Sequence, residues 1–291
     1  MNVIEVKNLK KYFGKTKAVD DISFTVEKGE IFGFLGPNGA GKTTTIRCMM
    51  DFIRPNEGSV SILGQDAQKD TVALKKKIGY LSGGAHLYKK WTGQEHINFV
   101  RGLNGKNDIA DELTRRLDFN PKLKAKNLSS GNKQKLSVIL ALMFQPELLI
   151  LDEPTLALDP LLQNVIYELL EEAVKRGSTV FMSSHNLAEV DRVCHRVGII
   201  KEGKMVAIED IQSMKDKKMH EVYARFAGHF NKNDFVTDGM QIIHESAESI
   251  TFNVKGDINP VIKKLSAHQL KDIHITQASL EEIFLEFYEK D

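Results

Sequence analysis

The stretch from Gly36 to Thr44 has the residue types and spacing of a phosphate-binding loop, G-x-x-x-x-G-K-T. The apolar run at 30–35 predicts a buried strand, and residues 43–50 predict the start of a helix. A glycine-rich turn in this context can direct backbone N–H groups into one concavity, and the helix N-terminus adds positive charge. An incidental lysine in a glycine-rich turn is the competing interpretation, and the strand–turn–helix context argues against it.

Within this loop we expect Lys42 to reach the β- and γ-phosphates of a nucleoside triphosphate and the Thr43 hydroxyl to bind Mg²⁺. The candidate nucleotide-binding residues of the loop are Gly36, Pro37, Asn38, Gly39, Ala40, Gly41, Lys42, Thr43 and Thr44.

Two acids follow another buried strand. Asp152 and Glu153 come directly after four aliphatic residues at 148–151. We expect this strand to lie beside the phosphate-loop strand in a parallel sheet, whose carboxyl edge is where ligands bind. Asp152 is then a candidate Mg²⁺ ligand, and Glu153 is the candidate catalytic base for the water that attacks the γ-phosphate. A solvated acidic turn is the simpler alternative.

His185 follows a strand predicted at 179–183. A single histidine at a strand end is often structural, but near a phosphate loop it can hydrogen-bond the γ-phosphate or the attacking water. Asp159 precedes Pro160 and is a predicted helix N-cap, which does not prevent it from contacting a partner subunit.

The remaining patterns predict the elements that position these residues. Strands are expected at 3–6 and 22–26, with a polar, turn-prone segment at 9–17 between them. Tyr12 and Phe13 in that segment are either core residues or candidates for stacking on a purine base. Further strands are expected at 59–63 and 78–81, mainly helical structure at 87–144, helices at 160–176 and 187–195, and a hairpin at 197–207.

From residue 211 the pattern changes to short strands and helices. The expected strands are 221–226, 241–244 and 249–254, and the expected helices are 259–266 and 280–288, the second capped by Ser279. We interpret residues 211–291 as a small accessory α+β subdomain with a binding or dimer-supporting role.

Composition limits the function classes. The net charge of +1 over 291 residues gives no reason to expect binding to nucleic acid. Two distant cysteines, Cys48 and Cys194, are expected to be buried thiols in a reducing cytosol. The first residues lack the layout of a signal peptide, and the apolar run at 138–144 is far shorter than the roughly 20 residues of a membrane span. We therefore expect a soluble cytoplasmic protein.

Taken together, the motifs resemble those of the nucleotide-binding subunit of an ABC transporter of the ABC-2 exporter type over about residues 1–210. In the order of the chain, Phe13 is similar to the adenine-stacking aromatic residue, and residues 36–44 are similar to the Walker A loop. Residues 128–135 are similar to the signature, and residues 148–154 are similar to the Walker B motif. Residues 158–160 are similar to the D-loop, and His185 is similar to the switch histidine. Tyr12 is the alternative to Phe13. Residues 279–285 are similar to the tail of ABC-2 ATPases that have a small extra domain.

The resemblance implies an α/β fold, a P-loop NTPase core of the ABC ATPase type. It comprises a RecA-like lobe with an antiparallel β subdomain and a helical lobe at about 87–145, in an ATPase domain of residues 1–210. It also implies ATP and Mg²⁺ as cofactors, and Glu153, His185 and Lys42 as catalytic residues.

The partners it implies are an ABC-2-type membrane permease and a second copy of the chain, or a homologous ATPase, in a head-to-tail dimer. Ser129 and Gly131 of one subunit would meet the γ-phosphate bound by the other, with Asp159 at the same interface. The permease would dock on the helical lobe between about 87 and 126. The subunit would then energise export of an unidentified substrate from the cytoplasmic side, as a peripheral protein on the inner face of the membrane.

The sequence departs from the family pattern at four positions. Gly83 stands where the family has a glutamine that contacts Mg²⁺ and relays to the permease, so that role is vacant or moved. Ser130 and Asn132 replace glycine and glutamine in the signature and keep small size and polarity. Ala157 replaces the glycine before the D-loop.

Two alternatives remain open at this point. An ABC-type ATPase acting on ribosomes or DNA is disfavoured by the single cassette and the balanced charge. A regulatory module that binds ATP with little turnover is disfavoured by Glu153 and His185, although Gly83 keeps it open.

Overall fold

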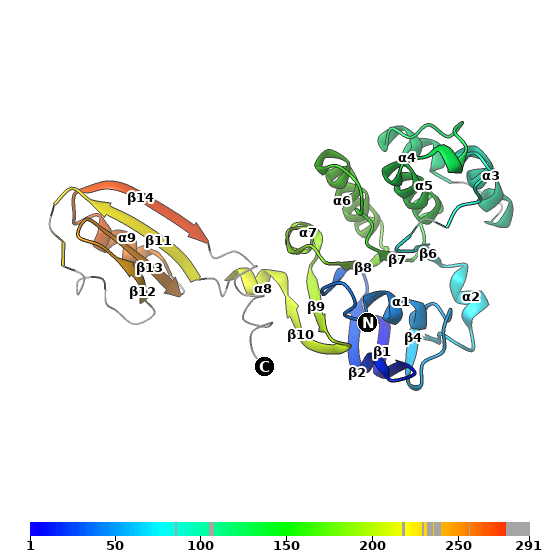
Figure 1. The fold of residues 1–291 in the computed structure, drawn as a ribbon, viewed down its shortest axis with the longest axis horizontal. Coiled ribbons are helices and arrows are strands. Elements are labelled where there is room, and N and C mark those ends of the chain that lie inside the picture. Colours follow the sequence, from blue (N-terminus) through cyan, green and yellow to red (C-terminus); the bar gives the residue numbers. More distant parts are fainter. Residues whose placement is uncertain are drawn as a thin grey trace. The chain divides into compact units, whose positions relative to one another are not determined.

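The computed structural model of the chain describes residues 1–84, 86–104, 108–216, 219–228, 230–231, 235, 240–255 and 257–277. It divides into two compact units, Met1–Glu209 and Asp210–Asp291 (Figure 1). The first unit contains the phosphate-binding pattern and both acids.

A six-stranded sheet forms the centre of the first unit, and the expected α/β fold is confirmed. Its order is β10 (Lys204–Asp210), β9 (Arg196–Lys201), β3 (Ile31–Leu35), β8 (Thr179–Ser184), β7 (Leu148–Asp152) and β6 (Ile78–Leu81). Strands β9, β3, β8, β7 and β6 run parallel to one another. All residues of β3, β7 and β8 are buried, which explains their continuous apolar runs.

One expectation about this sheet is wrong. The strand that ends at Asp152 does not lie beside the phosphate-loop strand, because β8 pairs with both and separates them. Both carboxyl ends still reach the same edge, since the three strands are parallel.

A second, four-stranded antiparallel sheet has the order β2 (Thr16–Glu27), β1 (Asn2–Phe13), β4 (Glu57–Ile62) and β5 (Gln65–Asp66). The segment at 9–17 is therefore not mainly a turn. Strand β1 continues to Phe13, which pairs with Thr16 at the start of β2, and the register between the two strands shifts at several points. Those irregularities let polar residues occupy a strand that the simple alternation did not predict.

Four phenylalanines join the two sheets. Phe24 of β2 stacks on Phe32 and Phe181 and lies tilted against Phe34, with ring centroids 5.4–5.9 Å apart. All four rings are buried. The antiparallel sheet is therefore held to the central sheet by aromatic packing as well as by aliphatic contacts.

Helices surround the central sheet and form a lobe at one end of the first unit. Figure 1 shows α3 (Gly93–Asn104), α4 (Ala110–Arg116) and α5 (Ser130–Leu142) gathered there, away from β1, β2 and β4. The other elements are α1 (Lys42–Met49), α2 (Thr71–Lys75), α6 (Pro160–Lys175), α7 (Leu187–Val193) and the short 3₁₀ helix Ala125–Asn127.

Side-chain caps begin two helices, and the predicted cap at Asp159 is confirmed. Thr92 and Glu95 exchange the hydrogen bonds of a capping box before α3, with Thr92 N–H to Glu95 Oε2 at 2.6 Å and Glu95 N–H to Thr92 Oγ1 at 3.2 Å. Asp159 caps α6 by accepting a hydrogen bond from Leu162 N–H at 3.0 Å.

The second unit is a small α+β structure. Its sheet has the order β12 (Met240–Glu245), β13 (Ser249–Lys255), β11 (Met219–Phe226) and β14 (Leu270–Gln277), with α8 (Ile211–Asp216) and α9 (Asn259–Leu265). Three strands and the helix at 259–266 were predicted. Strand β14 was missed, and the predicted helix at 280–288 with its Ser279 cap and the tail motif at 279–285 lie outside the described residues.

Both cysteines are free and buried, as expected. Burial raises the pKa of the Cys48 thiol to about 11 and that of Cys194 well above its usual value. Among the described residues, none of the helices has the length and apolar character needed to cross a membrane.

We predict that Phe24→Ala lowers the free energy of unfolding by about 3–5 kcal/mol, because it empties the ring site between the two sheets. Urea denaturation followed by circular dichroism measures the change. Val72→Ala is the control, since Val72 is 71% exposed and should change stability by less than about 0.5 kcal/mol. Equal stabilities of the two variants would contradict a supporting role for the aromatic cluster.

Candidate active site

The phosphate-binding loop connects β3 to α1. Gly41 is the N-cap of α1 and has a φ of 110°, and a Cβ there would lie 2.4 Å from the carbonyl oxygen of Ala18. Only glycine fits both constraints. The loop is anchored to the neighbouring strand by a hydrogen bond from Gly36 N–H to Ser184 O at 3.2 Å.

Lys42 folds over the loop. Its Nζ donates to the carbonyl oxygens of Gly36 at 2.7 Å and Pro37 at 3.1 Å and lies 3.7 Å from Glu153 Oε1. Burial lowers the pKa of Lys42, and the carboxylates of Glu153 and Asp152 oppose that shift. Lys42 lines a hollow of about 160 Å³. That hollow is lined by Ala18, Asn38, Gly39, Gly41, Lys42, Thr43, Thr44 and Glu153.

Asp152 is almost completely buried, at 1% exposure, and is fixed from two sides. Its Oδ2 accepts a hydrogen bond from Thr43 Oγ1 at 2.8 Å, and its Oδ1 accepts one from Ser183 Oγ at 2.5 Å. The carboxylate and hydroxyl predicted to bind a metal are therefore adjacent, although they lie more than a hundred residues apart in the sequence. Ser183 was not predicted, and the only signal for it was a polar residue at the end of an apolar strand.

Glu153 and His185 are also brought together. His185 Nδ1 lies 3.1 Å from Glu153 Oε1, and Glu153 therefore stands between an imidazole and the Lys42 ammonium group. The backbone of Glu153 is left-handed, with a φ of 53°, which is uncommon for a residue with a side chain. Its N–H is held by Ser183 Oγ at 3.1 Å.

Other predicted site residues lie elsewhere. Ser129 is the exposed N-cap of α5, where its hydroxyl accepts from Asn132 N–H at 3.2 Å. Gly131 packs against the carbonyl of Ala157, which a Cβ at residue 131 would approach to 3.0 Å. In the part of the chain that the structure describes, neither these two residues nor Asp159 lines the hollow of the phosphate loop.

The two aromatic candidates differ in their surroundings. Tyr12 donates its hydroxyl hydrogen to Asp20 Oδ1 at 2.6 Å, and this bond raises the pKa of the tyrosine. Phe13 is 51% exposed, with Lys11 Nζ 5.2 Å from its ring centroid. An exposed ring on the hairpin that also contributes Ala18 to the hollow makes Phe13 the better candidate for stacking on a base.

Gly83, the main departure from the family pattern, lies against Asp152. A Cβ at residue 83 would be 2.6 Å from Asp152 Oδ2 and 3.0 Å from its Cγ. Because Asp152 is buried and accepts hydrogen bonds from two hydroxyl groups, any movement of its carboxylate away from such a Cβ would disturb those bonds. Residue 83 therefore has no side chain, and in this conformation a side chain there would overlap the Asp152 carboxylate.

Comparisons with known proteins identify the family of the chain. The ABC transporter family model matches residues 19–156. The "Uncharacterized ABC transporter ATP-binding protein YhcH" of Bacillus subtilis is 34% identical over 98% of this chain and 95% of its own length. The chain belongs to the family of ABC transporter ATP-binding proteins. As a member, it binds and hydrolyses ATP and energises a separate permease.

Two other members are informative. The "Linearmycin resistance ATP-binding protein LnrL" of Bacillus subtilis is 38% identical over 71% of this chain and 68% of its own length. A solved structure described as "Dimeric Structure of MJ0796, a Bacterial ABC Transporter Cassette" is 25% identical and covers 72% of this chain and 98% of its own, with a TM-score of 0.66. The interpretation as an ATP-binding subunit of an ABC transporter is thus confirmed.

We predict that Gly83→Ala lowers kcat for ATP hydrolysis about tenfold or more, because the added methyl group displaces Asp152 from Thr43. Gly84→Ala is the matched control, since a Cβ there would meet only His86 Cε1, at 3.9 Å. Steady-state phosphate release from both purified variants measures the effect. Gly83→Gln meets the same obstacle at its Cβ, so we expect its rate to change as well. Equal rates for Gly83→Ala and Gly84→Ala would show that the close approach has no consequence.

Proposed function

We propose that the chain works as one half of a head-to-tail pair of ATPase subunits that drives an ABC-2-type export permease from the inner face of the cell membrane. The observation that supports this most is the convergence of Lys42, Thr43, Asp152, Glu153 and His185 at one edge of the central sheet. The site has a phosphate-binding cation, a metal-binding pair and a base, whereas Ser129 and Gly131 of the same chain are not among the described residues that line its hollow.

The residues present fit a magnesium ion. Thr43 Oγ1 and Asp152 Oδ2 are 2.8 Å apart, and hydroxyl and carboxylate oxygens are the ligands that Mg²⁺ prefers, together with phosphate oxygens and water. When bound with ATP, Mg²⁺ supplies positive charge to the β- and γ-phosphate oxygens. Ser183 would keep Asp152 oriented when Thr43 turns toward the ion.

Hydrolysis then needs a base and a group that holds it. Glu153 accepts a proton from the water that attacks the γ-phosphate, and Lys42 exchanges its carbonyl partners for phosphate oxygens. His185, 47% exposed and in contact with Glu153, hydrogen-bonds either the γ-phosphate or the attacking water. Phe13 stacks on the adenine.

The second subunit completes the γ-phosphate site. Ser129 and Gly131 stand at the exposed N-terminus of α5, a 13-residue helix, where backbone N–H groups attract anions. In a head-to-tail pair they face the phosphates bound by the partner, with Asp159 at the same interface. The dimeric MJ0796 cassette is a precedent for the pairing of two such subunits. ATP thereby joins the subunits, and hydrolysis separates them.

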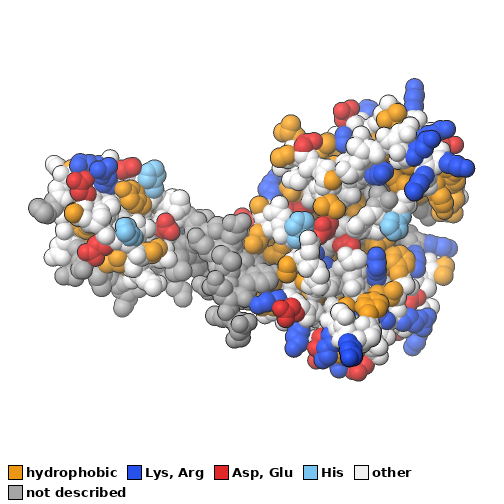
Figure 2. Space-filling view, in the orientation of Figure 1, with side chains coloured by type: hydrophobic (Ala, Val, Ile, Leu, Met, Phe, Trp, Pro, Cys, Tyr) orange, Lys and Arg blue, Asp and Glu red, His pale blue; other side chains and the backbone are white. Residues whose placement is uncertain are grey.

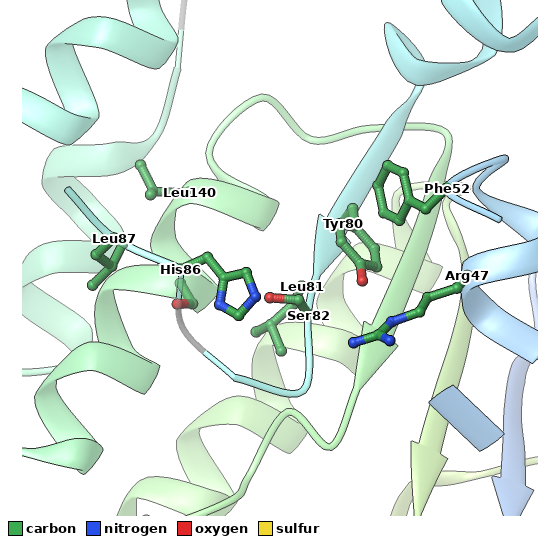
Figure 3. A pocket seen from close by; sticks show the side chains of 9 residues that line it. Arg47, Phe52, Tyr80, Leu81, Ser82, His86, Leu87 and Leu140 are labelled. Carbon is green, nitrogen blue, oxygen red and sulfur yellow. The ribbon is translucent and has the colours of Figure 1, made fainter. Parts of the chain in front are cut away.

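The permease docks beside the helical lobe, and a hollow of about 380 Å³ is the proposed contact site. Figure 3 shows Arg47 and His86 approaching it from opposite sides, with Tyr80 and Phe52 beside Arg47 and with Leu87 and Leu140 beyond His86. A second hollow shares Leu87 and is lined by Lys89, Lys126 and Lys133. Lys and Arg side chains gather over this lobe in Figure 2. A cytoplasmic permease segment with apolar and acidic side chains would match both hollows.

Export, and not import, is supported by the resemblance to the ABC-2 type and by the name of LnrL, which describes a resistance protein. The cargo is recognised by the permease, so it is not specified by this chain.

We predict that Glu153→Gln binds ATP but hydrolyses it about 10²–10⁴-fold more slowly, because an amide cannot accept the proton from water. The variant should accumulate as an ATP-bound dimer, measured by phosphate release and by size-exclusion chromatography with Mg²⁺ and ATP. Glu147→Gln, 61% exposed one residue before β7, is the control and should behave as wild type. Wild-type turnover in Glu153→Gln would remove Glu153 from the role of base.

We further predict that Arg47→Glu weakens co-purification of the permease, because it reverses the charge of the proposed docking hollow. The basal ATPase rate of the isolated subunit should not change, since Arg47 lines this hollow and is not among the residues that line the hollow of the phosphate loop. Arg54→Glu is the control, with a side chain that is 73% exposed outside the hollow. Undiminished co-purification of Arg47→Glu would exclude this hollow as the contact site.

A further inference from the structure

Glu189 is a buried acid next to the active site that none of the steps above uses. It lies on α7 and is only 4% exposed. Its two carboxylate oxygens accept hydrogen bonds from two different segments, from Ser184 Oγ at 2.5 Å and from Thr155 Oγ1 at 2.6 Å. Both hydroxyl-bearing residues are themselves buried.

These two segments carry the residues proposed to act on the γ-phosphate. Ser184 directly precedes His185, and Thr155 follows Glu153 by two residues. The pairing between β7 and β8 ends at Asp152 and Ser183, so Glu153 and His185 lie just beyond the regular ladder. The backbone of Glu153 turns left-handed at this point, which has an energetic cost that surrounding contacts must offset.

We propose that Glu189 is a positioning residue that clamps the segments after β7 and β8 together and thereby fixes Glu153 against His185. The inference rests on the proposed roles of Glu153 and His185. Backbone pairing between β7 and β8 stops at Asp152 and Ser183. Beyond that point, the carboxylate of Glu189 connects the two segments by accepting hydrogen bonds from both. It sets the 3.1 Å contact between His185 Nδ1 and Glu153 Oε1.

The clamp also connects to the phosphate loop. Gly36 N–H donates to the carbonyl oxygen of Ser184 at 3.2 Å, and Asn186 N–H donates to the Ser184 hydroxyl at 2.9 Å. A shift of Ser184 would therefore move the start of the loop together with the switch histidine.

The chemistry of Glu189 supports a specific role. Burial raises the pKa of Glu189, and the hydrogen bonds from Ser184 and Thr155 oppose this shift. An apolar residue would fill the same space without the desolvation cost of a carboxyl group. It would, however, remove the carboxylate acceptor of the Thr155 hydroxyl and leave the Ser184 hydroxyl only its longer hydrogen bond to the carbonyl oxygen of Asn186, at 3.2 Å. The presence of a buried acid at this position is therefore explained by its hydrogen bonds to the two segments that it joins.

The test is the steady-state kinetics of Glu189→Ala, Glu189→Gln and Glu30→Gln in the full chain. Glu30 is the matched control, because it is also a buried acid with a pKa raised by burial, but it precedes β3 at the end opposite the phosphate loop. We expect kcat to fall about 10- to 100-fold in Glu189→Ala, with the KM for ATP unchanged, because the reacting groups are displaced while the phosphate-binding residues remain.

Glu189→Gln should recover most of the rate. Its amide oxygen can accept from Thr155, and its NH₂ can donate to Ser184, whose hydroxyl works as donor or acceptor. Thr155→Val, which removes one arm without changing a charge, should lower kcat in the wild-type background and have little further effect when combined with Glu189→Ala. This variant keeps the test decisive if Glu189→Ala does not fold.

Three outcomes would overturn the clamp. A kcat of Glu189→Ala equal to that of Glu30→Gln, additive effects of Thr155→Val and Glu189→Ala, or no recovery in Glu189→Gln would each do so. If these appear while Glu153→Gln is inactive, the proposed site stands and only the clamp is wrong. Wild-type turnover in Glu153→Gln would overturn the proposed base and the clamp with it.

Discussion

The carboxylate of Asp152 is the point on which the rest of the site depends. A carboxylate at 1% exposure is stable only if its oxygens are hydrogen-bonded. Here one donor is Thr43 of α1, and the other is Ser183 of β8, the strand that lies between β7 and β3. These bonds align three separate segments. These bonds also fix the position of the carboxylate. Gly83 can lie this close to it because glycine has no side chain, whereas a Cβ at residue 83 would overlap the carboxylate.

The phosphate loop likewise provides hydrogen-bond acceptors for the ammonium group of its own lysine. Lys42 donates to two loop carbonyls, so the ammonium group is hydrogen-bonded although burial lowers its pKa. Arrival of a triphosphate would replace neutral acceptors with charged ones, and charge-assisted hydrogen bonds are the stronger kind. The loop is therefore ordered before binding, and little of the interaction energy is needed to arrange it.

The local parts of this site could be predicted from the sequence, and the long-range parts could not. The loop between strand and helix, the capping box at Thr92 and the cap at Asp159 follow from spacing within a few residues. The strand order did not follow, because periodicity says which segments are strands but not that β8 lies between β3 and β7. Ser183 and Glu189 were missed because a single serine or glutamate has no pattern, and only the fold shows that each is buried against a partner about 30 residues away. Strand β14 was missed although Ile273 and Ile275 alternate with polar residues as strand residues do.

Helix α5, which begins with the residues that resemble the signature, is hydrogen-bonded to the segment that follows β7 in the same chain. Gln134 of α5 donates from Nε2 to the carbonyl oxygens of Glu153 at 3.0 Å and Pro154 at 2.8 Å. In the proposed dimer, the N-terminus of this helix faces the ATP bound by the partner, while Glu153 acts on the ATP bound by its own loop. Contact of Ser129 with the partner's γ-phosphate would therefore be transmitted to the backbone of Glu153 through α5 and the side chain of Gln134. Each subunit would sense the occupancy of the opposite site through a bond that already exists in the single chain, so that closure of the pair and alignment of the base are one event.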